Sequence, residues 1–322
     1  MGRKTEQHKY FTEEKWIKVN EVNRTLTDEF MDYLTASGKS KETIKVYYNN
    51  LQIFFVWVLE NLNDKSVVEI NKKDIMKWQN FMVKLSLSSS RIRIMRSSVS
   101  SLCNYIENMC DDEYPDFRNI VNKVLAPKLQ YIREKTFITE DEFNIIKDEL
   151  IKNNDWQKVV YLCISYDSAC RRGEAFRILK NIDFENNKTN VVVGKGGKIF
   201  SLYFDDNTKE YIKKWLEIRG NDDCDKLFVV KKDGKVSEAK YATLYNWCNV
   251  FTDILKEKTG SNKVVYPHSL RGSRLTTLHY EKNVAVNVLQ EFAHHSDPST
   301  TLNHYIEKRE NDVINKIFNH IS

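Results

Sequence analysis

Four short segments of this chain hold the residues that are best suited to chemistry. They are Ser168–Glu174 (SACRRGE), Gly194–Lys198 (GKGGK), Pro267–Arg271 (PHSLR) and His295–Tyr305 (HSDPSTTLNHY). The segments supply arginines, a lysine on a glycine-rich turn, a histidine near an arginine, and a tyrosine preceded by histidines. Groups of these kinds bind anions, move protons and attack electrophiles, so their combination points to chemistry at a phosphate.

Each of these groups has a role that it could fill unaided. A helix that begins near Arg171 would aim a guanidinium at an anion beside the helix N-terminus. His268 and Arg271 are three positions apart, so on a helix they share a face and suit two oxygens of one phosphate. Lys195 on a hairpin tip could give a proton to a leaving group. Tyr305 could act as a covalent nucleophile if its phenol is activated.

Taken one at a time, these residues also have ordinary interpretations. An arginine at a helix start is often a surface ion pair, and a lysine in a glycine-rich turn is often only a turn residue. With 16 tyrosines in the chain, any one of them is more often a core or surface residue than a nucleophile. His294, His295 and His304 suggest zinc, but no cysteine lies at ligand spacing and adjacent histidines do not easily face one ion. We therefore expect no metal site.

The order and spacing of the four segments narrow these alternatives. An arginine box, a hairpin lysine, a His-x-x-Arg pair and a histidine followed ten positions later by tyrosine together resemble the tyrosine site-specific recombinases, the phage integrase family. The resemblance covers roughly residues 22–322. Two positions depart from the family pattern. His294 stands where the family usually has glycine before the last histidine, and Gly272 stands where the His-x-x-Arg pair is usually followed by histidine.

The resemblance implies a reaction and a role for each residue. The catalytic side chains would be Arg171, Lys195, His268, Arg271, His295 and Tyr305. Tyr305 would attack a DNA phosphate, form a 3′-phosphotyrosyl link and release a 5′-hydroxyl, which Lys195 would protonate. The two arginines would hold the non-bridging oxygens, and the two histidines would hydrogen-bond the phosphate and help proton transfer. Glu174 would orient His268. No metal or other cofactor would be required.

The elements that must position these residues are predicted to be mostly helices. Only 4 prolines and 10 glycines among 322 residues favour long helices with few turns. The predicted fold is mainly α, with an N-terminal helical bundle that resembles the SAM-like core-binding domain of the family. A mostly helical catalytic domain follows, with a small antiparallel β-sheet formed by a hairpin over 191–204. Its expected helices span 155–168, 173–180, 207–219, 238–258, 269–281, 284–293 and 307–320.

Capping residues and changes in periodicity predict the domain limits. The expected regions are an N-terminal arm over 1–22, a helical DNA-binding core domain over 23–115, a linker over 116–137 and the catalytic domain over 138–322. Ser40 is a candidate N-cap for a helix whose apolar stripe runs from Ile44 to Leu59. Thr139 and Glu142 form a capping-box pattern at the start of the second domain.

Basic charge is concentrated in the first domain. The candidate DNA-binding residues are Lys72, Lys73, Lys77, Lys84, Arg91, Arg93 and Arg96, with Asp74 the one acid in that stretch. An apolar stripe from Ile92 to Met109 would leave Arg93, Arg96 and Ser100 on the opposite helix face. Such a segment is typical of a surface that follows phosphates, although a charge run can also be a plain solvated helix face.

Composition excludes several classes of protein. No apolar run is long enough to span a membrane, and residues 1–10 lack the apolar region of a signal peptide. The six cysteines include no Cys-x-x-Cys pair and are expected to be reduced thiols. The formal net charge of +5 permits nucleic acid without requiring it. We expect a cytoplasmic protein that associates with the nucleoid and is encoded by a bacterium or phage.

Two questions stay open at the level of sequence. The first is whether the chain exchanges DNA strands or is a phage-type repressor that binds double-stranded DNA with the recombinase fold alone. The second concerns the apolar stripe of the helix over 307–320, formed by Val313, Ile314, Ile317, Phe318 and Ile321. This stripe could dock on a second copy in a homo-oligomer on DNA, or fold back on its own core.

Overall fold

The computed structural model of the chain describes residues 11–130 and 136–294. The chain divides into two compact units, Met1–Arg133 and Glu134–Ser322. Each unit has its own hydrophobic core. His295, Tyr305 and the helix expected over 307–320 lie outside the described residues, as do residues 1–10 of the expected arm. None of the described helices is long and apolar enough to cross a membrane.

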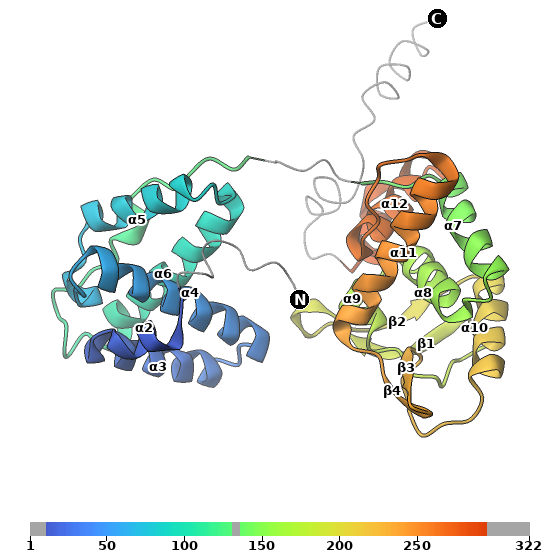
Figure 1. The fold of residues 1–322 in the computed structure, drawn as a ribbon, viewed down its shortest axis with the longest axis horizontal. Coiled ribbons are helices and arrows are strands. Elements are labelled where there is room, and N and C mark those ends of the chain that lie inside the picture. The colour runs from blue at the N-terminus through green and yellow to red at the C-terminus, as the bar shows by residue number, and fades with distance from the viewer. Residues whose placement is uncertain (1–10, 131–135, 295–322) are drawn as a thin grey trace, which may run out of the picture. The chain divides into compact units, whose positions relative to one another are not determined.

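The first unit is a helical bundle (Figure 1). Its helices are α2 (Glu13–Lys18), α3 (Glu21–Ala36), α4 (Lys41–Asn61), α5 (Lys72–Lys84) and α6 (Ser89–Met109), with short 3-10 turns over Val67–Glu69 and Val121–Lys123. Ser40 caps α4 as predicted, since its hydroxyl accepts a hydrogen bond from the Thr43 N–H at 3.2 Å. The central residues of the predicted α4 stripe are buried in the core, where Phe54 packs edge-on against Trp78 of α5. The predicted bundle is confirmed.

The prediction of an arm over residues 1–22 is wrong for its second half. The side chain of Thr12 caps α2, and Trp16 and Val19 are buried in the core of the first unit. α3 begins at Glu21, before the predicted domain start. A six-residue helix with one buried residue is too short to give the periodic apolar pattern that the prediction relied on.

The predicted linker also begins too early. Phe117 and Val121 are buried in the first core, so the chain beyond residue 115 still belongs to that unit. Asn119 fixes this stretch to α6 by donating from its side chain to the Ser100 carbonyl at 3.0 Å. The weak periodicity reflects packing through isolated side chains and 3-10 geometry rather than through a regular helix.

The second unit surrounds one buried helix, α8 (Trp156–Asp167), in which every residue from Val159 to Tyr166 is buried. The other helices are α7 (Glu140–Lys152), α9 (Arg172–Ala175), α10 (Asp206–Arg219), α11 (Tyr241–Thr259), α12 (Pro267–Tyr280) and α13 (Val286–Phe292). α7, α9, α10 and α12 all pack on α8. The Thr139–Glu142 capping box opens α7 as predicted, through reciprocal hydrogen bonds of 2.8 and 3.2 Å. One predicted helix, 173–180, is reduced to the four residues of α9.

Between residues 136 and 294, the strands of the second unit form two antiparallel hairpins. β1 (Lys188–Val193) and β2 (Ile199–Tyr203) form the predicted one, with Val193 opposite Ile199. β3 (Val229–Lys232) and β4 (Lys235–Glu238) form a second hairpin, whose last residue occupies the start of a predicted helix. Asp233 and Gly234 join these strands with positive φ at both positions, the geometry that a two-residue type I′ turn requires. That Asp-Gly pair was the signal that sequence reasoning missed.

Candidate active site

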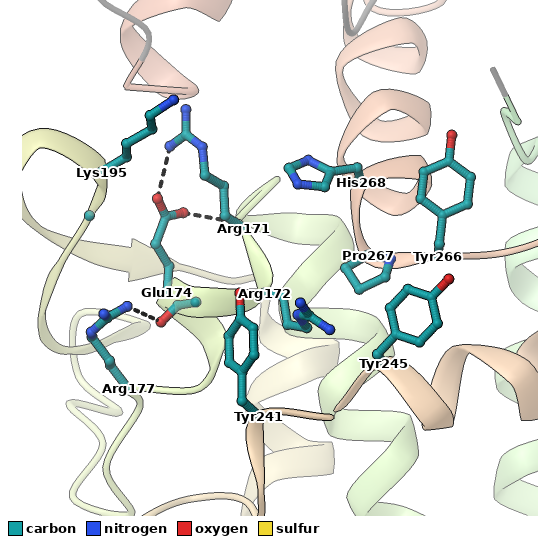
Figure 2. A pocket seen from close by; sticks show the side chains of 12 residues that line it. Arg171, Arg172, Glu174, Arg177, Lys195, Tyr241, Tyr245, Tyr266, Pro267 and His268 are labelled. Carbon is teal, nitrogen blue, oxygen red and sulfur yellow. Dashed lines mark hydrogen bonds and ion pairs between the residues drawn. The ribbon is translucent and has the colours of Figure 1, made fainter. Parts of the chain in front are cut away.

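Three segments of the second unit that lie far apart in the sequence meet around one pocket. The pocket has a volume of about 300 Å³. Arg171 and Glu174 reach it from the start of α9, Lys195 from the tip of the β1–β2 hairpin, and His268 from the first turn of α12 (Figure 2). Three of the six predicted catalytic side chains therefore line one cavity. Arginines and a lysine line the pocket, so it suits an anionic group.

Arg171 is held in place by Glu174. The backbone N–H of Arg171 donates to Oε2 of Glu174 at 2.7 Å, and its guanidinium donates to Oε1 at 2.8 Å. Glu174 is 2% exposed, so its carboxylate is an anchor inside the protein rather than a surface charge. Both carboxylate oxygens bind Arg171, and the orientation of His268 by Glu174 stays a prediction. One edge of the guanidinium faces Glu174, and its other N–H groups can serve an anion.

The hairpin tip needs glycine before Lys195 for a steric reason. A Cβ atom on Gly194 would lie 2.6 Å from a ring carbon of Phe200 and 3.2 Å from Oε1 of Glu174. A contact of 2.6 Å essentially does not occur at real Cβ atoms, so any other residue would displace the Phe200 ring, and it would also crowd the carboxylate that holds Arg171. Gly194 thus allows the hairpin to lie against the α9 segment, and the exposed Lys195 follows it at the pocket.

His268 is tuned by its surroundings. Its ring lines the pocket although the residue as a whole is solvent-exposed. Loss of hydration around the ring lowers its pKa, and the nearby charges of Arg271 and Arg171 lower that pKa further. The imidazole is therefore neutral at neutral pH. A neutral imidazole can accept a proton from a hydroxyl group or hydrogen-bond a phosphate.

Arg271 is not among the described residues that line the pocket, and its predicted role at the phosphate stays a prediction. The residue is 1% exposed, and its guanidinium donates to the carbonyls of Ala169 and Ala293. The spacing predicts that Arg271 and His268 share a helix face. In the structure, however, the Arg271 side chain is buried whereas His268 is exposed. Ala169 lies two positions before Arg171, and Ala293 lies two positions before His295. Arg271 therefore ties together the two backbone segments that lead to predicted site residues.

His294, one of the two departures from the family pattern, has a left-handed backbone. Its φ is 52°, in the region where glycine is usual and histidine is tolerated better than most residues. Its ring stacks on Phe200 at 3.7 Å, and its carbonyl accepts a hydrogen bond from Lys198 at 3.2 Å. A side chain at this turn is thus accommodated by packing against the hairpin that carries Lys195.

The pocket includes residues that sequence reasoning missed. Arg172, Arg177, Tyr241, Tyr245 and Tyr266 all line it. Arg172 was available as the neighbour of Arg171. The tyrosines come from the first two turns of α11 and the residue before α12, and nothing in their local pattern distinguishes them from other tyrosines in the chain.

The basic segment of the first unit is only partly a charged surface. Lys72, Lys73, Lys77, Lys84 and Arg93 are exposed, and Arg91 is half-buried with its guanidinium on Asn50 at 2.8 Å. Arg96 is buried at 6% exposure and donates to the Gln79 side chain at 2.7 Å and to the carbonyls of Val121 and Val124. The prediction that Arg96 faces away from the core is therefore wrong. Arg96 satisfies backbone carbonyls instead.

Replacing Arg96 with alanine is expected to lower the free energy of unfolding by about 2–4 kcal/mol, because it leaves buried carbonyls without a donor. The exposed Lys73 is the matched control, and Lys73→Ala should change stability by less than about 0.5 kcal/mol. Urea unfolding of the whole chain, followed by tryptophan fluorescence, measures both variants. Equal stabilities would contradict the structural role of Arg96.

Comparisons with known proteins agree with the geometry. The phage integrase family matches residues 136–312, and the N-terminal SAM-like domain of phage integrases matches residues 26–116. The chain is 31% identical over 322 residues to the SPbeta prophage-derived recombinase-like protein YomM of Bacillus subtilis (strain 168), covering 95% of this chain and 94% of that protein. It is 27% identical over 281 residues to tyrosine recombinase XerA of Pyrococcus horikoshii, covering 87% and 88%.

Solved structures share the fold at low sequence identity. A lambda integrase dimer bound to a COC′ core site gives a TM-score of 0.65 at 16% identity, over 86% of this chain and 96% of that one. The Tn1549 transposon integrase in complex with transposon right end DNA gives a TM-score of 0.63 at 17% identity, over 94% of this chain and 99% of that one. Similarity at this level establishes the architecture, and the sequence matches establish the lineage. The chain belongs to the phage integrase family, with tyrosine recombinases among its relatives.

Proposed function

We propose that this chain cuts and rejoins DNA strands through a 3′-phosphotyrosyl intermediate, in the integration or excision of a phage or other mobile element. The observation that carries the proposal is the meeting of Arg171, Lys195 and His268 around one pocket, from three separate parts of the sequence. Membership of a family that includes tyrosine recombinases supports the same reaction. The protein would act in the cytoplasm of a bacterial host.

The proposed reaction conserves bonds. The phenol oxygen of Tyr305 attacks phosphorus, one P–O bond to tyrosine forms, and the P–O5′ bond breaks. Arg171, fixed by Glu174, binds a non-bridging oxygen, where negative charge increases. Lys195 gives its proton to the departing 5′-oxygen. A 5′-hydroxyl from the partner strand then attacks the phosphotyrosine and restores the backbone without an external energy source.

The remaining predicted residues have supporting roles in this proposal. His268 accepts a proton or a hydrogen bond at the phosphate, in keeping with its lowered pKa. His295 would supply a second imidazole at the phosphate. Arg271 would hold the other non-bridging oxygen, and its guanidinium also joins the segments before Arg171 and His295. All the groups assigned to catalysis are amino-acid side chains, so the proposed reaction needs no cofactor.

Double-stranded DNA is the proposed partner of both units. The exposed lysines of α5 and Arg93 would bind phosphates and set the register, while the pocket of the second unit engages the strand to be cut. Lambda integrase is known as a dimer on a core site and as a tetramer on a Holliday junction. By analogy we propose a homo-oligomer on DNA, with the helix over 307–320 as its interface.

Replacing Lys195 with alanine is expected to slow strand cleavage about 10²-fold, because the 5′-oxygen must then leave without a proton. A substrate with sulfur in place of that oxygen should restore the rate, since a thiol with a pKa of about 8.5 leaves readily as the thiolate. Single-turnover cleavage of both substrates measures the effect. Lys198→Ala, which removes the other hairpin lysine, is the comparison. A Lys195→Ala defect that sulfur does not rescue would contradict the proton-donor role.

The proposal is tested by covalent capture. A duplex that the protein selects from a random-sequence pool is prepared with nicks along one strand, so that a cleaved fragment diffuses away and religation fails. The wild-type chain should then give a protein–DNA band that survives denaturation. Specific binding without any such band would instead indicate a repressor that uses the fold for occupancy alone. No observation favours that second function, since the relatives named above are a recombinase-like protein, a tyrosine recombinase and two integrases.

A further inference from the structure

Arg172 lines the pocket and, among the described residues, contacts aromatic rings rather than a carboxylate. Its guanidinium carbon lies 3.8 Å from the centroid of the Tyr241 ring and 5.4 Å from that of Tyr245. These rings lie one turn apart at the start of α11, and Figure 2 shows Arg172 between them while Arg171 points toward Lys195. The extended backbone at Arg171, with φ −81° and ψ 152°, makes the two successive side chains diverge.

The two neighbouring arginines differ in how their charge is balanced. Arg171 forms an ion pair with the buried Glu174 at 2.8 Å. In the part of the chain that the structure describes, no carboxylate pairs with Arg172, and its contacts with aromatic rings are its side-chain interactions. Ring faces attract a guanidinium but do not neutralise it, and they leave its N–H edge available. Arg172 is thus pre-positioned with its full charge at the pocket.

The pocket has more positive charge than one phosphodiester can balance. Arg171, Arg172, Arg177 and Lys195 all line it, and Glu174 is the one carboxylate among its lining residues in the described chain. Once Glu174 is paired with Arg171, three cations face the single charge of one phosphate. A strand of DNA brings further phosphates immediately beside the first, so a second phosphate would satisfy the remaining charge.

We infer that Arg172, supported by the rings of Tyr241 and Tyr245, binds the phosphate next to the scissile one on the same strand. The identity of the scissile phosphate rests on the proposed function. The guanidinium edge donates two parallel hydrogen bonds to the non-bridging oxygens of this neighbouring phosphate. Fixing the neighbour limits rotation of the strand, so the scissile phosphorus is presented to the nucleophile in one orientation.

The test removes the positive charge of Arg172 in the protein or the negative charge of one phosphate in the DNA. Wild-type protein and Arg172→Gln are compared on the selected duplex, with single neutral methylphosphonates placed at every phosphate in turn. Arg172→Gln should bind the unmodified duplex about tenfold more weakly, with a salt slope lower by about 1. One methylphosphonate should weaken the wild type by a similar factor and leave Arg172→Gln unaffected. That phosphate should adjoin the one at which the covalent adduct forms.

Variants of Tyr241 distinguish the contact of its ring face with Arg172 from a general contribution of Tyr241 to packing. Tyr241→Phe keeps the ring face and should bind like wild type, whereas Tyr241→Leu should weaken binding about as much as Arg172→Gln. Thermal unfolding of each variant reports folding separately. Equal losses in the phenylalanine and leucine variants would contradict the role of the ring face.

Two results of the phosphate scan would overturn the inference. They are additive losses at every phosphate and coupling to the scissile phosphate itself. Failure of the proposed function gives a different result. In that case no covalent adduct forms, while Arg172 still couples to one phosphate in the binding assay.

Discussion

The Tyr305→Phe variant is expected to lose covalent capture of DNA completely, by at least about 10⁴-fold, while it binds the selected duplex as tightly as the wild type. Only one hydroxyl is removed, and without a nucleophile no phosphotyrosine forms. The phosphate-binding groups around the pocket are unchanged, so the ground-state complex keeps its affinity. Adduct formation on a denaturing gel and equilibrium binding by fluorescence anisotropy measure the two quantities on the same duplex.

Tyr266 provides the matched control for this variant. It lines the pocket, two positions before His268 in the sequence, and is a tyrosine of the described chain that could serve as an alternative nucleophile. Tyr266→Phe should keep forming the adduct. If Tyr305→Phe still forms the adduct and Tyr266→Phe does not, the nucleophile is Tyr266 and not Tyr305.

The Arg171→Ala variant is expected to slow cleavage by about 10³-fold, because it removes a pre-organised donor from the oxygen on which negative charge increases. The effect on DNA binding should be much smaller, since most of the proposed phosphate contacts involve other residues. Arg171→Lys keeps the charge but loses the planar fork, so it should recover only a small part of the rate. Single-turnover cleavage with saturating protein measures each rate.

Glu174 makes the Arg171 experiment more specific. If the carboxylate acts by holding the guanidinium, Glu174→Gln should slow cleavage in the wild-type background but add nothing to Arg171→Ala. The double variant also avoids leaving a buried, unpaired carboxylate, which would reduce stability by itself. Independent, additive losses would contradict the coupling of these two residues.

Much of the fold was predictable because a long apolar stripe determines both the type of an element and the face that it buries. The α4 stripe and its Ser40 cap, the α7 capping box and the hairpin that carries Lys195 are each defined within a few consecutive residues. The missed helix α2 has too few buried residues to produce a recognisable periodic apolar pattern in the sequence. The missed β3–β4 hairpin depends on an Asp-Gly turn between strands of four residues each.

The site was predictable as a set of residue types but not as a set of contacts. Spacing placed His268 and Arg271 on one helix face, yet only packing decides that the Arg271 guanidinium turns inward to the Ala169 and Ala293 carbonyls. Charge alone placed Arg96 on a DNA surface, although its partners are carbonyls 25 and 28 positions away. Side-chain direction and long-range hydrogen bonds are properties of the folded chain and leave no local pattern.

Identification of the residue that becomes attached to DNA tests the central claim most directly. The adduct trapped on the nicked duplex is digested with nuclease and protease, and the modified peptide is sequenced by mass spectrometry. We predict a nucleotide linked through its 3′-phosphate to Tyr305, with a free 5′-hydroxyl on the released strand. A nucleotide on any other residue, or a 5′-phosphate linkage, would contradict the account.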